Sequence, residues 1–353
     1  MNMETAILKA GQPGPEDKDM IRTAAMLTRD LNAAKPSVYY ADLLLSALVG
    51  YGAVAVTILT MSPAIAWVAA IVAVLALYRA ASFIHEITHI KDGSVPAFRL
   101  VWNAIIGVPL LVPSFMYEGI HNLHHSRTRY GTAEDPEYLP LALMKPWTVP
   151  LFVIASAFGP VALLFRYGIL GPLTAFIPPL RRIVVERYSG LVINPAFRRK
   201  PATGDQRRNW LWQETATSLW AMFLIFGTAF GILPLRAVAI FLGIASGALV
   251  LNQIRTLVAH LWANEGEVLS ITDQYLDSVN VPPPGLLPAL WAPVGLRYHA
   301  LHHLLPGVPY HALGEAHRRI TEALPQASAY HRGNYKSLTG LVSNLVKGTM
   351  HSR

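Results

Sequence analysis

Four apolar stretches, each about as long as a bilayer is thick, constrain this chain more than any other feature. They are residues 38–60, 64–84, 217–233 and 235–258. A helix needs about 20 apolar residues to cross the hydrocarbon core, so each stretch is long enough to span it. The turns at 61–63 and 233–235 are so short that neighbouring spans must form hairpins. We therefore predict an all-α integral membrane protein built on two transmembrane hairpins.

The composition agrees with this prediction and excludes several site types. Only 14% of the 353 residues are charged, against about 25% in soluble domains. The chain has no cysteine, which excludes disulfides, thiolate zinc sites, a catalytic cysteine and cysteine-ligated iron–sulfur clusters. Residues 1–36 are polar and lack a signal-peptide pattern, so we expect a cytoplasmic tail with one short surface helix. Residues 37–325 would form the membrane domain, and 326–353 a basic C-terminal tail.

Two further apolar stretches are ambiguous. Residues 100–115 are too short to span comfortably, and residues 149–171 contain Arg166 and two Gly-Pro pairs. If 149–171 crossed the membrane alone, the histidine motifs described below would lie on opposite faces. We therefore predict that both stretches are interfacial or re-entrant helices.

The positive charge lies almost entirely on the side of the histidines. Of the 29 lysines and arginines, the predicted outer turns carry only Arg236. This bias predicts that the histidines and both termini are cytoplasmic, and it explains the net charge of +8 without a nucleic-acid partner. The densest basic run indicates either topology and contact with anionic lipid, or docking of an acidic electron donor or a phosphate-bearing substrate. It comprises Arg181, Arg182, Arg187, Arg198, Arg199, Lys200, Arg207 and Arg208.

The histidines occur in motifs with helical spacing. Residues 85–89 read HEITH, which fits the HExxH zinc-protease signature but also the first part of a larger cluster. Two H-x2-H-H motifs follow, at His121, His124 and His125 and at His299, His302 and His303. Residues three or four apart share one face of a helix, so each motif can aim its imidazoles at one point.

The number of histidines argues against a zinc protease. A catalytic zinc takes three protein ligands and leaves one position open, so it has no use for the remaining histidines. Two transition-metal ions with four or five ligands each could use them all, although imidazole suits several metals. Carboxylates behind the rings should then orient them, and we expect Glu86 to do this instead of acting as a protease base. The other candidates near the motifs are Glu118, Asp135, Glu137 and Asp277. The isolated His311, His317, His331 and His351 are expected to be hydrogen-bonded or interfacial side chains.

These motifs, taken together, resemble the membrane fatty acid desaturase family in its bacterial form. HEITH, HNLHH at 121–125 and HALHH at 299–303 correspond in order to its three histidine boxes. His260, after the fourth span, is similar to an additional ligand of the acyl-CoA branch. That branch has an asparagine where this chain has Thr256, and Asn264 is a possible substitute. Box one has three intervening residues, as in the lipid-acyl and hydroxylase branches.

The resemblance implies two non-haem iron ions, dioxygen as co-substrate, and His260 beside the eight box histidines as ligands. It also implies removal of two hydrogens from an acyl chain on a phospholipid, coenzyme A or a carrier protein. Electrons would come from a separate ferredoxin- or cytochrome-type donor with its reductase, and the location would be a bacterial inner membrane. We expect a fatty acyl desaturase, with a lipid, alkane or carotenoid hydroxylase or ketolase as the alternative. An intramembrane zinc protease and a non-enzymatic metal-binding or transport protein are the remaining alternatives.

Overall fold

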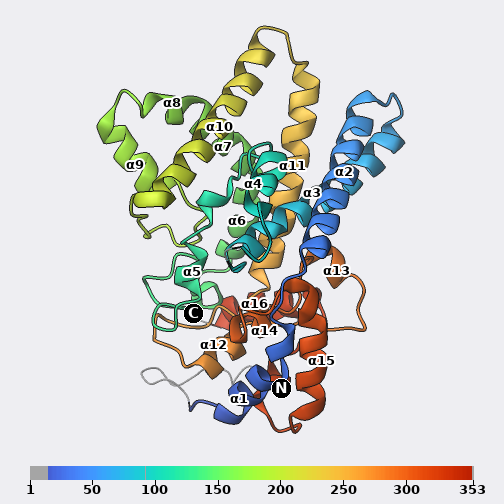
Figure 1. Ribbon diagram of the computed structural model, residues 1–353, viewed down its shortest axis with the longest axis vertical. Coiled ribbons are helices and arrows are strands. Elements are labelled where there is room, and N and C mark those ends of the chain that lie inside the picture. The colour runs from blue at the N-terminus through green and yellow to red at the C-terminus, as the bar shows by residue number, and fades with distance from the viewer. Residues whose placement is uncertain (1–14, 92, 352–353) are drawn as a thin grey trace.

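The computed structural model describes residues 15–91 and 93–351, and these residues form helices without a single strand. The first 14 residues of the predicted N-terminal tail lie outside the described residues. Figure 1 shows two long hairpins, α2–α3 and α10–α11, that extend in the same general direction from a body of shorter helices. The all-helical prediction is confirmed.

The first hairpin packs through small and apolar side chains. It consists of α2 (Pro36–Leu59) and α3 (Pro63–Ile87), each with proline in its first turn, where a missing N–H costs nothing. Leu43, Ala73 and Leu77 are fully buried between the helices. A Cβ on Gly50 would lie 2.6 Å from the Leu77 side chain, so glycine is what lets the two helices approach this closely.

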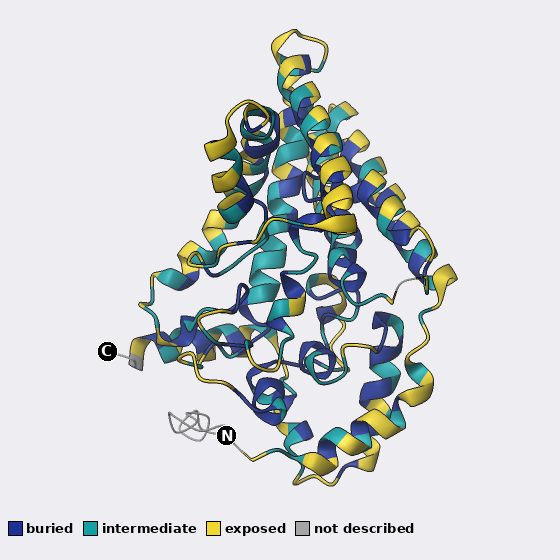
Figure 2. Ribbon diagram, turned by 60° about the vertical axis from the view of Figure 1, so that its left-hand side comes forward, coloured by how far each residue is buried: buried dark blue, intermediate teal, exposed yellow. Residues whose placement is uncertain are grey.

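The outer faces of these helices are apolar and exposed, as lipid requires. Figure 2 shows exposed residues along the upper parts of the long helices. Four helical segments are long and apolar enough to cross a membrane: Pro36–Leu59, Pro63–Ile87, Thr148–Leu173 and Leu235–Leu257. At most 39% of the most apolar window in any of them is buried within the protein. Exposing the rest of this apolar surface to water would be unfavourable, whereas contact with lipid hydrocarbon is not.

The predicted span at 217–233 has different limits in the structure. It is the outer part of α10 (Gly204–Ala229), and residues 230–234 form the turn to α11 (Leu235–Leu257). The inner part of α10 is polar, which is why this helix is not among the four apolar segments. Figure 1 nevertheless shows α10 and α11 rising together to a common tip. The prediction therefore placed the outer end too far along the chain and missed the polar extension.

The chain returns to the histidine side after the stretch 149–171, but its helices together are long and apolar enough to cross a membrane, so its interfacial or re-entrant character stays a prediction. Its helices are α6 (Thr148–Ile154), α7 (Gly159–Phe165) and α8 (Gly171–Leu173), with a 3-10 turn and a π turn between them. Before it, Ala142 donates from its backbone N–H to Trp262, two residues after His260. After α9 (Pro178–Tyr188), Leu191 donates to Met116, five residues before His121. The guanidinium of Arg166 in this segment lies 2.5 Å from the carboxylate of Glu214 in α10, which offsets its charge.

The other ambiguous stretch begins in α4 (Phe98–Trp102) and a π turn over Asn103–Gly107. This apolar helix, Phe98–Gly107, is too short to span a membrane. It packs against α3, since the buried Trp102 indole donates to the Ala80 carbonyl at 2.8 Å. The structure thus agrees with the expectation that 100–115 does not cross alone.

Both predicted tails contain packed structure. The expected short helix is α1 (Lys18–Leu27), but its apolar face is buried against α15 (Leu313–Ala323) instead of lying free at the surface. Beyond residue 326, a 3-10 turn and α16 (Leu338–His351) follow, and Tyr330 is fully buried. Residues on both sides of the predicted domain boundary, between 325 and 326, therefore pack together.

Candidate metal centre

The first histidine motif is presented by the last turn of α3. His85 and Glu86 lie inside the helix and are buried, and His89 follows its C-terminal end. The backbone N–H of His89 donates to the Glu86 carbonyl at 2.9 Å, which keeps His89 on the helical path. Both imidazoles therefore leave the membrane hairpin at its inner end, as the spacing predicted.

The second motif forms a one-turn helix, α5 (His121–His124). Gly119 precedes it with φ +76°, a left-handed conformation that glycine adopts without strain. His121 donates from its backbone to the Tyr117 carbonyl, which starts the turn. His121 and His124 are almost fully buried.

The third motif and His260 are positioned by one shared extended segment. Box three lies on α14 (His299–Leu304), and His260 follows α11. His260 pairs with Ser278 in an antiparallel bridge just after α12 (Ile271–Asp277). Two residues on, the side chain of Asn280 accepts from the Leu301 backbone at 3.0 Å. Segment 278–280 therefore holds the lone histidine and box three at a fixed separation.

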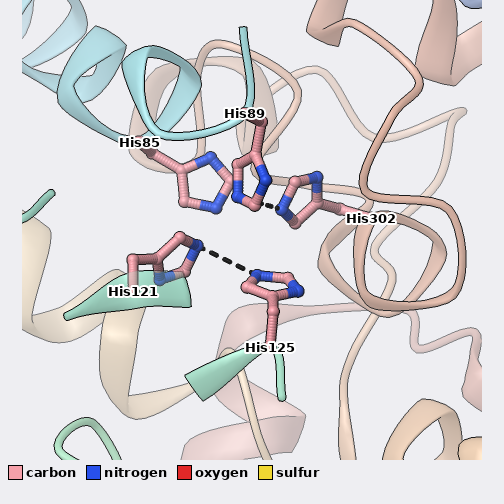
Figure 3. A group of neighbouring side chains, drawn as sticks. All are labelled: His85, His89, His121, His125 and His302. Atoms are coloured by element: carbon pink, nitrogen blue, oxygen red, sulfur yellow. Dashed lines mark hydrogen bonds between the residues drawn. The ribbon is translucent and has the colours of Figure 1, made fainter. Parts of the chain in front are cut away.

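The nine predicted ligands form two groups. His85, His89, His121, His125 and His302 make one group, and His124, His260, His299 and His303 make the other. Within each group the candidate ligand nitrogens lie within 4.8 Å of one another. Figure 3 shows the group of five, with rings from three separate segments facing a common space. The prediction that all nine histidines converge is confirmed by this geometry.

The two groups adjoin each other. The rings of His125 and His303, one from each group, stack with centroids 4.2 Å apart. Boxes two and three each contribute to both groups, so neither group can form without the other's segments. This is the arrangement expected for two neighbouring metal ions.

The donor set fits transition-metal ions. Ring nitrogens face each other at 3.1 Å between His89 and His302 and at 3.1 Å between His260 and His299. Both ring nitrogens of His85 are buried without a hydrogen-bond partner among the described residues. A neutral imidazole has one donor and one acceptor nitrogen, and buried polar atoms normally find partners. A cation at the centre of each group would satisfy these lone pairs.

Burial keeps these rings neutral and ready to bind a cation. It lowers the pKa of His89 to about 4. Burial, followed by the neighbouring histidines, holds the pKa values of His121, His302 and His303 well below the usual range. For His124, burial acts in the same direction but is outweighed by Asp135, so its pKa is raised.

Carboxylates lie behind three of the rings, on the side away from the common space. Asp135 is 2.9 Å from Nδ1 of His124, and two backbone N–H groups hold the carboxylate in place. Glu137 lies 3.2 Å from Nδ1 of His121, and burial raises the pKa of Glu137 to about 7. Such partners fix the ring orientation and leave the opposite nitrogen for the metal. The expected role of Asp135 is supported by this contact.

Asp277 acts on His260 through a tyrosine. The hydroxyl of Tyr130 lies 2.8 Å from Nδ1 of His260 and 2.8 Å from the Asp277 carboxylate. The carboxylate itself is 3.9 Å from that nitrogen, and burial raises its pKa to about 6. Tyr138 donates to the other oxygen of Asp277 at 3.2 Å. Asp277 was predicted to orient a ring, and Tyr130 is the residue that makes the contact.

Comparison with known proteins agrees with this geometry. The model of the fatty acid desaturase family matches residues 36–335. This chain belongs to the fatty acid desaturase family. It is also 47% identical over 331 residues to a ceramide hydroxylase of Caulobacter vibrioides, and the match covers 94% of each chain. No solved structure matches the chain.

Family membership shows that a zinc protease was the wrong interpretation of HEITH. Glu86 also does not make the contact with a ligand that was predicted for it. Glu86 accepts from the Tyr39 hydroxyl at 2.5 Å and from the Tyr310 backbone at 3.2 Å. It is 4.0 Å from His85 Nδ1, which has no hydrogen-bond partner in the described part of the chain. Glu86 therefore joins α3 to α2 and to the loop after box three, and it does not hydrogen-bond a ligand.

Two further candidates support the site without touching a ring. Asn264 donates to the carbonyls of Gly131 and Glu267 at 3.0 and 2.8 Å, so it braces the loop after box two. Glu118 pairs with Arg99 and accepts from Ser114 ahead of box two. Asn264 as a substitute for the asparagine of the acyl-CoA branch stays a prediction.

Sequence reasoning missed the tyrosines behind the rings. Tyr117 stacks on His121 and its hydroxyl lies 2.8 Å from the ring nitrogen. The position of Tyr117, four residues before His121 on a helical path, is the signal that could have revealed it. Tyr130 could have been found only through the long-range pairing of box two with Asp277.

The isolated histidines make ordinary hydrogen bonds, as predicted. His317 lies 2.8 Å from the Tyr330 hydroxyl, His331 contacts the Leu324 carbonyl, and His311 accepts from the Lys35 backbone. The side chain of His351 lies outside the described residues. None of the three described histidines belongs to either group.

Part of the basic run makes contacts within the protein, and its role toward lipid or an electron donor stays a prediction. Arg181 pairs with Glu214 and Arg182 with Glu186. Arg199 is buried, donates to the Glu118 carbonyl at 2.7 Å and lies over the Trp210 ring. These contacts pair some of the arginines that were considered for docking an acidic electron donor.

Proposed function

We propose that this protein is a dioxygen-dependent lipid hydroxylase that acts on a ceramide-type substrate. The observation that carries the proposal is the two adjoining histidine groups on a chain 47% identical, over 94% of both lengths, to a protein named ceramide hydroxylase. From the sequence alone, desaturation was the favoured activity and hydroxylation the alternative. Both activities use the same scaffold, so the scaffold does not decide between them. The relative is named a hydroxylase and therefore supports the alternative better.

The chemistry assigned to the site follows from its donors. Two iron ions held by the nine histidines would supply dioxygen activation and attack on an unactivated C–H bond, which acid–base side chains cannot achieve. The residues of this chain hold neutral imidazoles toward the two centres and keep carboxylates behind them. Burial of both groups excludes bulk water from the reacting position, which limits side reactions.

The membrane location matches the substrate. The apolar helices α3 and α11 end beside His85 and His260, so a lipid would reach the site without leaving the bilayer. The charge bias supports a site on the cytoplasmic face of an inner membrane, where reductant is available. Because this chain has no cysteine, a separate electron donor with its reductase would provide the electrons.

Lipid analysis under labelled dioxygen tests the proposal. A host that makes ceramide is given the gene or an empty vector, and its lipids are compared by mass spectrometry. We expect a ceramide that has gained one oxygen atom derived from dioxygen. A product that has instead lost two hydrogen atoms, without labelled oxygen, would establish desaturation and overturn the proposal.

A further inference from the structure

A cavity of about 430 Å³ lies beside the first histidine motif, outside the two histidine groups. Its walls come from the segment after box one, from the start of α4 and from one face of α10. Ile87 and Ile90 form part of the wall and flank His89 in sequence. The volume is within the range of about 300–1,000 Å³ that small-molecule sites occupy.

The lining is apolar on one side and polar on the other. Val95, Phe98 and Leu100 contribute apolar surface, and Leu100 is 57% exposed. The face of α10 adds Asn209 and Trp212, which are both exposed. Tryptophan favours the membrane–water boundary, so the opening lies where the polar head of a lipid would sit.

Gln213 adds a hydrogen-bond donor that the protein does not use. Only 1% of this residue is exposed, and its Oε1 accepts from the Phe115 backbone at 2.9 Å and lies 3.3 Å from the Ser114 hydroxyl oxygen. A backbone N–H can only donate, so the amide oxygen must face Phe115 and the NH2 group must take the other position. No acceptor for that NH2 group is found among the described residues. Gln213 lines the cavity, so this NH2 group is available to donate to an oxygen of a molecule bound there.

The charges next to the cavity are either offset by a carboxylate or exposed to solvent. The guanidinium of Arg99 lies 3.4 Å from the Glu118 carboxylate, which offsets its charge. Lys91 is exposed at the edge of the cavity. The Gln213 NH2 group and Arg99 Nε, which is buried without a hydrogen-bond partner among the described residues, remain as donors in the lining, and both fit an oxygen such as an amide carbonyl or a hydroxyl.

We infer that this cavity binds the neutral polar head of the lipid substrate, with the Gln213 amide donating to an oxygen of that head. The inference rests on the proposed function and names the site that selects the substrate. The head held there would leave the acyl chain to extend toward the histidine groups. Gln213 is thus a specificity residue that takes no part in the reaction.

Binding and kinetics of two variants test the inference. Gln213→Met keeps the length of the side chain and removes the donor, while Gln206→Met makes the same change at an exposed position outside the cavity. We expect Gln213→Met to raise KM for ceramide by about tenfold, the value of one hydrogen bond, with kcat nearly unchanged. Gln206→Met should leave both constants unchanged. Because Gln213→Met also removes the acceptor for Phe115, Asn209→Trp is a second variant, which narrows the opening from an exposed position and should raise KM as well.

A binding assay separates this inference from the proposed function. Displacement of a fluorescent ceramide by short-chain ceramide is measured without dioxygen, so it does not depend on which product forms. Weakened binding in both cavity variants, with normal metal content, supports the inference even if the product is a desaturated lipid. Equal binding in all variants, or tighter binding of phosphorylated ceramide than of ceramide, would overturn it.

Discussion

Tyr130 is the residue through which Asp277 controls His260. Its hydroxyl contacts both the ring and the carboxylate, and Ser278 is the other group near the same ring nitrogen, at 3.2 Å. Tyr130→Phe removes one hydroxyl and leaves the ring packing. Loss of a group that orients a metal ligand typically costs about 10–100-fold in metal affinity or activity. We expect a loss in that range in kcat and in iron retained after exposure to a chelator. Unchanged retention would mean that Ser278 alone orients His260.

His260 is the predicted ligand with the least local signal in the sequence. His260→Ala removes one of four donors from its group, so we expect turnover to stop and iron content to fall toward half. His331→Ala is the matched control, because that ring lies outside both groups and contacts the Leu324 carbonyl. If elemental analysis gives the same iron content for both variants, His260 is no ligand.

Glu86 belongs to the frame of the site. Glu86→Gln preserves an oxygen for Tyr39 but replaces a charged acceptor by a neutral amide in a buried position. Hydrogen bonds to charged groups contribute about 1.5–3 kcal/mol, so the thermal midpoint should fall while kcat per bound iron stays within a few-fold. A protease base would behave in the opposite way, since general acid–base catalysis contributes about 10²–10⁴-fold. A large loss of kcat with unchanged stability would contradict the structural role.

At the scale of elements, segment 278–280 connects the end of α12 to His260, box three and the C-terminal region. Asn280 is fully buried, accepts from Leu301 and donates to Asn334 at 3.2 Å. Asn280→Leu leaves these backbone and side-chain groups without partners, at about 1–3 kcal/mol for each buried group. We expect lower stability and a selective loss of metal from the group of four. Spectroscopy that shows both groups equally affected would argue against a local role.

The sequence predicted these elements unevenly, for physical reasons. The spans and the three boxes depend on local periodicity, which one chain displays directly, so α2, α3, α11 and the eight box histidines were found, whereas His260 was assigned through the family resemblance. The partners of the rings depend on contacts between distant segments, such as Tyr130 with Asp277, which no local pattern encodes. Glu86 was misassigned because its neighbour in sequence is His85, whereas its hydrogen bonds go to Tyr39 and Tyr310.

At the scale of the whole molecule, the C-terminal region belongs to the fold. Its backbone pairs with Asn280 at Gly333 and Tyr335, and Tyr330 accepts from the buried Tyr275 hydroxyl. A chain ending at residue 325, the predicted boundary of the membrane domain, should therefore accumulate poorly and retain little metal. A chain ending at residue 337 keeps these pairings and is the control. Full metal content in the shorter chain would show that the C-terminal region is dispensable.

The central claim concerns two metal ions in two histidine groups, and anomalous X-ray diffraction at the iron edge tests it most directly. Crystals are grown from protein prepared without oxygen in iron-rich medium. We predict two peaks per chain, one among His85, His89, His121, His125 and His302 and one among His124, His260, His299 and His303. A single peak shared between the groups, or a single zinc with no iron, would contradict the account.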